Sequence, residues 1–180
     1  HFTEQLLGLV IIQMRTNYVL IDYENVQPSS LAGLDAEHFR VLVFVGASQS
    51  KLTFEIVAAV QKLGVRAEYV KIAGNGSNAL DFHIAFHIGQ LAAQDPTACF
   101  HIVSGDSGFD PLIKHLKERK VFASRSKDVS EIPILKPANT KTKPARIDLV
   151  LANLQQRGDS KPKTMKTLRN MIESLFMKQL

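Results

Sequence analysis

Apolar residues along the chain fall into short continuous runs, separated by longer segments in which they recur with helical spacing. Five runs predict strands: Tyr18–Asp22, Val41–Val45, Ala67–Ile72, Cys99–Ser104 and the weaker Val121–Ala123. Most of these runs are apolar at every position rather than at alternate positions. That pattern is typical of strands buried on both faces of a parallel sheet.

Helical patterns lie between the predicted strands, over Leu52–Leu63, Ala79–Ala93 and Pro111–Glu118. Gly64 is a natural stop for the first, and Asp110 before Pro111 is a candidate N-cap for the third. Strands that alternate with helices form right-handed crossovers. The sequence therefore predicts an α/β fold, a three-layer α/β/α sandwich with a central, mostly parallel sheet.

Three prolines between residues 131 and 144 indicate a boundary. The sequence thus predicts a domain over residues 14–135, a linker over 136–144 and a helical segment over 145–180. That segment contains two helical patterns, Ala145–Arg157 and Lys163–Gln179. The second carries an apolar stripe of Met165, Leu168, Ile172, Leu175 and Phe176, which is interpreted as a packing face. Two helices bury little surface, so they are expected to dock on the domain, belong to a larger unit or join copies of the chain into an oligomer.

Residues 1–13 form a leader of uncertain status. Its apolar run, Leu6–Ile12, is shorter than the roughly 20 residues of a membrane helix. It also lacks the basic start and cleavage site of a secretory signal. An expression remnant, an upstream misreading and a short packing segment are the alternatives, and no membrane partner is expected. The single cysteine, Cys99, excludes an internal disulfide, and it fits a buried thiol in a reducing, cytoplasmic protein.

Charge is unevenly distributed along the 180 residues. The net formal charge is −2 over residues 1–135 and +7 over residues 136–180. A basic tail indicates a polyanionic partner such as nucleic acid, and a solvated basic linker is the alternative. The candidate nucleic-acid contacts are Lys141, Lys143, Lys163 and Lys166 of the tail, and Lys51 in the loop after the second predicted strand. For that loop, an ordinary strand-to-helix connection is the favoured interpretation over a phosphate contact.

Acidic residues lie where the predicted strands end. Asp22 closes the first strand, Asp106 follows the fourth, and Asp81 opens the helix after the third. Since function in open α/β sheets sits at the carboxyl ends of the strands, these three acids are expected to converge. Clustered carboxylates repel one another unless a cation lies among them, and oxygen ligands suit Mg²⁺ or Mn²⁺. A structural alternative remains for Asp81, as an acid in the first turn of a helix capped by Asn78.

Further polar residues accompany these acids. Glu24 and Asp110 are additional metal-ligand candidates, although Asp110 also fits the N-cap described above. Asn25, Ser104 and Asn78 are candidate supporting residues, with Asn25 placed to orient Asp22. His83 and His87 have a metal-compatible spacing. They point largely away from the Asp81 face of the helix and have no evident third ligand, so packing or surface roles are favoured over a zinc site.

The order DYENV, NALDFHIAFHIG and HIVSGDSGFDPLI, over about residues 17–135, resembles the PIN-like superfamily and especially its NYN-type branch. The resemblance implies a Rossmann-like sheet and a metal-dependent ribonuclease in which Asp22, Asp81 and Asp106 bind metal. Many NYN-type sequences read SGDSDF where this chain has SGDSGF. The fourth acid is therefore absent at Gly108, and Asp110 is the candidate to replace it.

Three functions follow from these patterns. The first is a metal-dependent nuclease that cleaves phosphodiester bonds, with RNA as the expected substrate. The second is a non-catalytic PIN-like module that binds RNA or a protein partner, which Gly108 favours slightly. The third is a phosphatase of the haloacid dehalogenase kind. It ranks last because such an enzyme needs an aspartate where this chain has Glu24.

Overall fold

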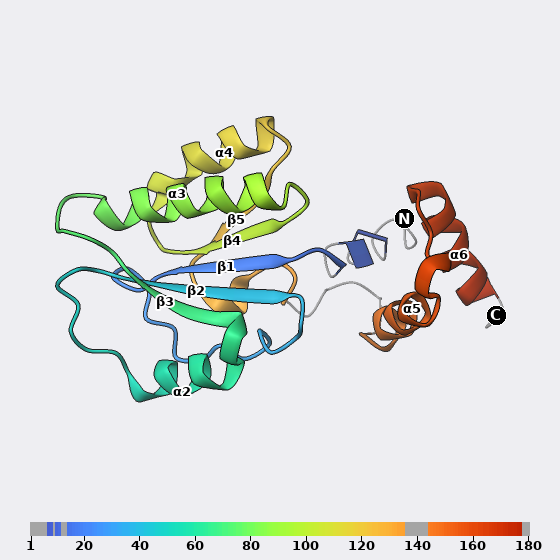
Figure 1. The fold of residues 1–180 in the computed structure, drawn as a ribbon, viewed down its shortest axis with the longest axis horizontal. Helices are drawn as coiled ribbons and strands as arrows, with labels where there is room; N and C mark the ends of the chain where they lie inside the picture. The colour runs from blue at the N-terminus through green and yellow to red at the C-terminus, as the bar shows by residue number, and fades with distance from the viewer. Residues whose placement is uncertain (1–6, 9, 12–13, 136–143, 178–180) are drawn as a thin grey trace. The chain divides into compact units, whose positions relative to one another are not determined.

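Five strands form one sheet in which every neighbouring pair is parallel, in the order β3-β2-β1-β4-β5 (Figure 1). The strands are β1 (Asn17–Asp22), β2 (Phe39–Val45), β3 (Ala67–Lys71), β4 (Cys99–Val103) and β5 (Phe122–Ser126). The predicted α/β fold with a parallel central sheet is confirmed. The structure is a computed structural model that describes residues 7–8, 10–11, 14–135 and 144–177. It divides into two units, Arg15–Lys136 and a second formed by His1–Met14 with Pro137–Leu180.

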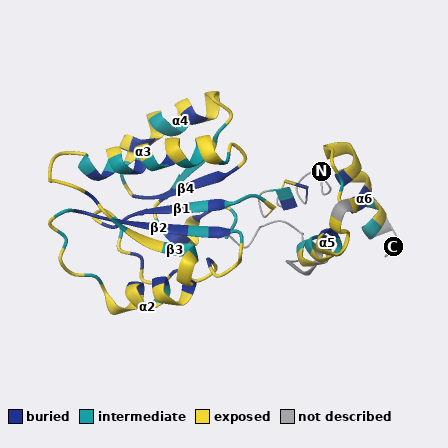
Figure 2. Cartoon of the chain, in the orientation of Figure 1, coloured by how far each residue is buried: buried dark blue, intermediate teal, exposed yellow. Residues whose placement is uncertain are grey.

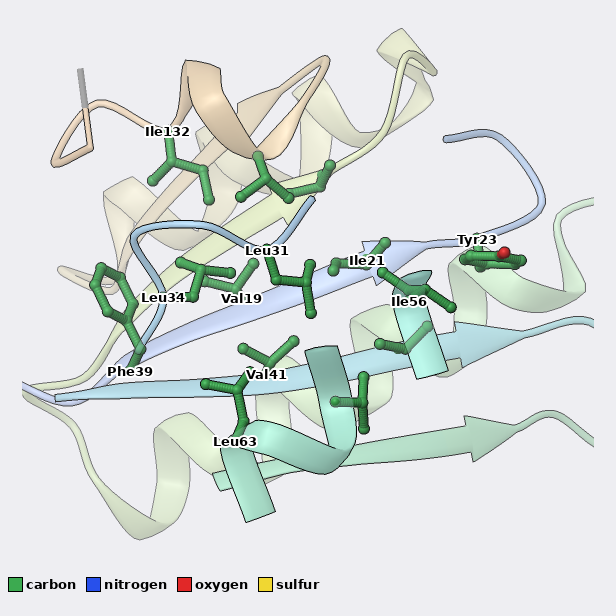
Figure 3. Close-up of a cluster of buried hydrophobic side chains, with 14 of the residues drawn as sticks. Val19, Ile21, Tyr23, Leu31, Leu34, Phe39, Val41, Ile56, Leu63 and Ile132 are labelled. Carbon is green, nitrogen blue, oxygen red and sulfur yellow. The ribbon is translucent and has the colours of Figure 1, made fainter. Parts of the chain in front are cut away.

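Helices cover both faces of the sheet, so the first unit has three layers (Figure 1). Helix α2 (Phe54–Leu63) packs on one face, and α3 (Ala79–Gln94) and α4 (Asp110–Glu118) pack on the other. Side chains alternate between the two faces along β1, where Val19 and Ile21 meet the α2 side and Leu20 meets the α3 side. The α2 side, closed by Leu31, Leu34 and Ile132 from loops, is drawn in Figure 3.

The central strands β1, β2 and β4 are buried along most of their length, which explains their largely apolar sequences (Figure 2). Every residue of β4 is buried, and Tyr18 is the only residue of β1 that is partly exposed. At the edge, β5 begins one residue later than predicted and continues through Ser124, Arg125 and Ser126. An edge strand tolerates such polar positions because only one of its sides is paired.

Two helix starts in the first unit differ from the sequence prediction. Helix α2 begins at Phe54, because the Oγ1 atom of Thr53 caps it by accepting a hydrogen bond from the backbone N–H of Ile56 at 3.4 Å. Its end at Gly64, with φ of 59°, is as predicted. The predicted N-cap role of Asp110 is wrong: Asp110 is the first helical residue of α4, and the cap position is held by Phe109 without a side-chain hydrogen bond. The Asp110 carboxylate binds Arg125 instead.

The second unit contains helices α5 (Pro144–Gln156) and α6 (Met165–Met177). Thr164 caps α6, because its Oγ1 atom accepts a hydrogen bond from the backbone N–H of Thr167 at 3.2 Å. The apolar core of this unit contains residues of both helices and of the leader: Leu7, Val10, Val150, Leu154, Leu168, Met171 and Ile172. Leu7 and Val10 are buried, which agrees with the packing-segment alternative for the leader. Met165, which was expected in the stripe, is 55% exposed. Among the described residues, no helix is long and apolar enough to cross a membrane.

A buried histidine, His101, lies in the middle of β4. One ring nitrogen of His101 is 2.8 Å from Asn17 Oδ1 and the other is 3.2 Å from Ser124 Oγ. Burial, assisted by the nearby charge of His38, lowers the pKa of His101 from 6.5 to about 4. The ring is therefore neutral in the folded protein at neutral pH.

We expect this histidine to make the free energy of unfolding fall in mild acid. The unfolded chain takes up a proton below pH 6.5, whereas folded His101 resists protonation until about pH 4. Its contribution is therefore complete above pH 6.5 and is lost as the pH falls toward 4, by about 2 kcal/mol between pH 7 and pH 5. Urea unfolding at a series of pH values measures it. His101→Gln should reduce the slope of the free energy of unfolding against pH. An unchanged slope would assign the acid sensitivity to other groups, such as His38, because burial also lowers the pKa of His38.

Candidate functional site

The sheet order changes direction between β1 and β4, and the acidic residues gather at the carboxyl ends of these two strands. The chain runs outward from β1 through β2 to β3, then crosses back to place β4 on the other side of β1. A crevice forms at such a switch point because the loops on its two sides turn away from each other. Asp22 is the last residue of β1, and Asp106 follows β4 by three residues.

A pocket of about 200 Å³ lies at this place. Its lining combines the end of β1, the turn after β4 and the start of α3. The lining residues are Asp22, Glu24, Asn25, Gly76, Asn78, Ala79, Leu80, Asp81 and Asp106. The structure thus brings Asp22, Asp81 and Asp106 to one pocket, together with the candidates Glu24, Asn25 and Asn78. Asn78 precedes α3 with φ of 60°, a left-handed conformation that asparagine tolerates, and its side chain makes no capping hydrogen bond.

Ser104 links the two acids at the switch point. Its hydroxyl is fully buried and donates a hydrogen bond to Asp22 Oδ2 at 2.7 Å. The Oγ atom of Ser104 also accepts a hydrogen bond from the backbone N–H of Asp106 at 3.1 Å. One side chain therefore orients the Asp22 carboxylate and fixes the backbone that carries Asp106. This explains why a polar residue closes the otherwise apolar β4 segment.

Asn25 and two glycines complete this link. The Asn25 side-chain oxygen accepts a hydrogen bond from the Gly105 N–H at 2.7 Å, so the loops after β1 and β4 are joined directly. A Cβ atom at Gly105 would stand 2.8 Å from that oxygen, which only glycine avoids. Asp106 Oδ1 accepts a hydrogen bond from the Gly108 N–H at 2.7 Å, which holds its carboxylate against its own turn.

Electrostatic repulsion is built into this pocket. Burial raises the pKa of Asp22 above its ordinary value and the charge of Asp106 adds to the rise, while hydrogen bonds from Ser104 and the Asn25 N–H oppose it. Burial also raises the pKa of Asp81, and the charges of Asp22, Asp106 and Glu24 add to the rise. A cation in the pocket would relieve the repulsion.

The donor atoms in the pocket fit a hard divalent cation, because they are carboxylate and amide oxygens. As the side chains stand, no three His, Cys, Asp or Glu residues of the described part of the chain are close enough together to hold a metal ion. Asp22 and Asp106 are fixed by hydrogen bonds. No hydrogen bond among the described residues holds the carboxylates of Asp81 or Glu24. A complete metal site would therefore require these two side chains to rotate toward the fixed pair.

Asp110 lies outside this pocket. Its two carboxylate oxygens accept hydrogen bonds from the Arg125 guanidinium at 2.8 and 3.2 Å, and this partner lowers the pKa of the carboxyl. The same guanidinium donates to the Ser104 carbonyl oxygen at 3.2 Å, so the ion pair braces the segment that carries Asp106. Sequence reasoning did not single out Arg125. Arg125 lies two residues beyond the predicted strand Val121–Ala123, and the sequence carried no signal that pairs it with Asp110.

The other described candidates do not line this pocket. Lys51 is exposed and does not line the pocket. Nδ1 of His83 is 2.6 Å from the carbonyl oxygen of Ala79, and Nδ1 of His87 is 2.7 Å from that of His83. These contacts within the helix fit the packing role rather than a zinc site. Lys163 and Lys166 are exposed near the start of α6. Lys141 and Lys143 lie outside the described residues.

Comparison with known proteins adds one match. The profile of the PIN domain matches residues 16–126, which include the whole sheet and every residue that lines the pocket. No curated protein and no solved structure gives a match to the chain.

Proposed function

Because the chain belongs to the PIN domain family, we propose that it is a metal-dependent nuclease of the NYN-type branch that cleaves phosphodiester bonds in RNA. The observation that supports this most is the convergence of Asp22, Asp81 and Asp106 on one pocket at the switch point of the sheet. These acids come from three separate segments of the chain. Their closeness is electrostatically unfavourable, and a divalent cation would make it favourable.

In this proposal Asp22, Asp81 and Asp106 hold Mg²⁺ or Mn²⁺, and Glu24 is the candidate for a fourth acid. A bound metal of this kind offsets charge that develops on a phosphate and makes water a better nucleophile at neutral pH. The protein supplies position. Ser104 and the Asn25 N–H hold the Asp22 carboxylate, the Gly108 N–H holds that of Asp106, and Asp81 is free to adjust.

Incubating the full chain with single-stranded RNA and Mn²⁺ tests the proposal, with EDTA as the matched control. We expect metal-dependent shortening of the RNA that stops when EDTA is added. If metal binds but varied RNA and DNA strands all remain intact, the chain is a PIN module that binds without cutting, and the nuclease proposal is wrong.

The basic second unit is proposed to draw nucleic acid toward the acidic pocket, whose own charge repels phosphate. Lys163 lies just before α6 and Lys166 in its first turn, where positive charge opposes the helix dipole, so an external anion explains them better than helix stability does. In Lys163→Gln with Lys166→Gln, we expect weaker RNA binding. The slope of log affinity against log salt should also be smaller by about 1.4, since fewer counterions are released.

RNA affinity of the full chain at several salt concentrations, in EDTA, measures this effect. Lys62→Gln on α2 is the control, because this exposed lysine belongs to the first unit and does not line the acidic pocket. Slopes that agree between the tail variant and the parent would contradict a guiding role. They would leave the basic charge of the second unit as a solvated surface.

A further inference from the structure

Helix α3 exposes two phenylalanine rings on the side that faces away from the sheet. Its core stripe, Leu80, Ile84 and Ile88, is at most 3% exposed. Phe82 and Phe86 lie opposite that stripe and are 69% and 65% exposed. The helix is already anchored by its core stripe, so the two rings are not needed to fold it. Large apolar side chains placed together in water usually mark a binding surface.

The exposed side of α3 begins at the acidic pocket. Ala79, the first residue of α3, lines the pocket and stands three residues before Phe82, and Phe86 follows four residues after Phe82. Residues three or four apart lie on the same side of a helix, about 5–6 Å apart along its axis. Ala79, Phe82 and Phe86 thus lie along one side of α3, which leads away from the pocket. The His87 ring lies edge-on to Phe86, with ring centroids 5.6 Å apart.

Positive charge lies on the neighbouring helix. Helices α3 and α4 cover the same face of the sheet, lie side by side in Figure 1 and pack into the same apolar core. Four basic residues on α4 and in the turn after it are exposed: Lys114, Lys117, Arg119 and Lys120. Exposed aromatic rings beside exposed lysines match a single nucleic-acid strand, in which unpaired bases stack and phosphates carry the negative charge.

We propose that the outer surface of α3 and α4 is a track for single-stranded RNA that enters or leaves the acidic pocket. Two unpaired bases stack on Phe82 and Phe86, and Lys114 and Lys117 contact the phosphates beside them. This inference rests on the proposed function, and it adds selectivity: bases in a duplex are already stacked and paired, so their faces are not free for the rings. The site would therefore accept unpaired strands and exclude duplexes.

Binding of a short fluorescent poly-U RNA to the full chain in EDTA tests the track without requiring cleavage. Phe82→Ala with Phe86→Ala should weaken binding roughly tenfold or more, because each stacked base contributes substantially to affinity. Phe82→Tyr with Phe86→Tyr should bind like the parent, whereas Phe→Leu changes at both positions should not restore binding. Lys114→Gln with Lys117→Gln should reduce the salt dependence. The same RNA annealed to its complement should bind weakly to the parent and be unaffected by the Phe82 and Phe86 changes.

Phe54→Ala is the matched control, since Phe54 is 80% exposed on α2, which covers the other face of the sheet. The inference is overturned if the Phe82 and Phe86 double alanine variant binds poly-U like the parent, or if Phe54→Ala loses as much affinity. It is also overturned if the parent sediments as a dimer that the double variant breaks apart, because the rings would then serve self-association. A chain that binds through these rings but never cuts RNA would refute the nuclease proposal alone. A chain that cuts RNA with unchanged affinity in the double variant would refute only the track.

Discussion

Replacing Asp106 by asparagine should lower the rate of Mn²⁺-dependent RNA cleavage by about a hundredfold or more, and Asp22→Asn should do the same. Each change removes one negative charge from the proposed metal site while keeping the size of the side chain and one oxygen that accepts hydrogen bonds. In Asp22→Asn, the remaining side-chain oxygen can still accept the hydrogen bond from the Ser104 hydroxyl. In Asp106→Asn, it can still accept the one from the Gly108 N–H. The fold should remain, and the loss should appear in the rate of cleavage rather than in the amount of folded protein.

Initial rates of cleavage of a labelled single strand, at saturating Mn²⁺, measure this loss. Asp35→Asn is the control, because Asp35 is an exposed aspartate outside the acidic pocket. If Asp106→Asn and Asp22→Asn both cut RNA at the parent's rate, another part of the chain carries the activity. The proposed assignment of the acids would then be wrong.

Mg²⁺ or Mn²⁺ should raise the melting temperature of the chain. A ligand at a hundred times its Kd stabilises the folded state by about 2.7 kcal/mol, which corresponds to a shift on the order of 10 °C for a domain of this size. Relief of the carboxylate repulsion that contributes to the raised pKa of Asp22 and Asp81 is part of this binding free energy.

Asp81→Asn separates metal binding from repulsion. Without metal, this variant should be more stable than the parent, because one of the repelling charges is gone. With metal, it should gain less. Thermal unfolding of the parent, Asp81→Asn and the Asp35→Asn control measures both effects. The melting temperature in EDTA gives the stability without metal, and its rise in Mn²⁺ gives the gain from metal binding. A parent and an Asp81→Asn variant that respond equally to Mn²⁺ would place the metal elsewhere.

The sequence was sufficient to predict the central sheet and the convergence of the acids, for a physical reason. Strands such as β4 are buried on both faces, so almost no polar residue is tolerated until the strand ends. Apart from the buried His101 on β4, the polar residues Asp22 and Ser104 therefore mark the ends of these strands. In a parallel sheet all strand ends of one kind lie on one edge. Knowing the ends was enough to expect Asp22 and Asp106 near each other without knowing the strand order.

Features that depend on a partner from elsewhere in the sheet were not predictable in the same way. Asp110 before Pro111 has the local pattern of an N-cap, but its carboxylate binds Arg125, which is near only because β5 lies beside β4. The exposure of Phe82 and Phe86 could not be predicted either. In DFHIAFHIG nearly every position is apolar or aromatic, so the sequence alone does not show which side of α3 faces the sheet.

The strand order also determines when the parts of the pocket can assemble during synthesis of the chain. Ser104 and Asp22, whose hydrogen bond sets the site, are 82 residues apart in sequence. At about 5–20 residues synthesised per second, the ribosome needs roughly 4 to 16 s to add the second partner after the first. During that interval β1 has no β4 beside it, Asp22 lacks its buried hydroxyl donor, and Asp106 does not yet exist. Until Ser104 has been added, a growing chain therefore lacks the hydrogen bond that orients Asp22 in the acidic pocket.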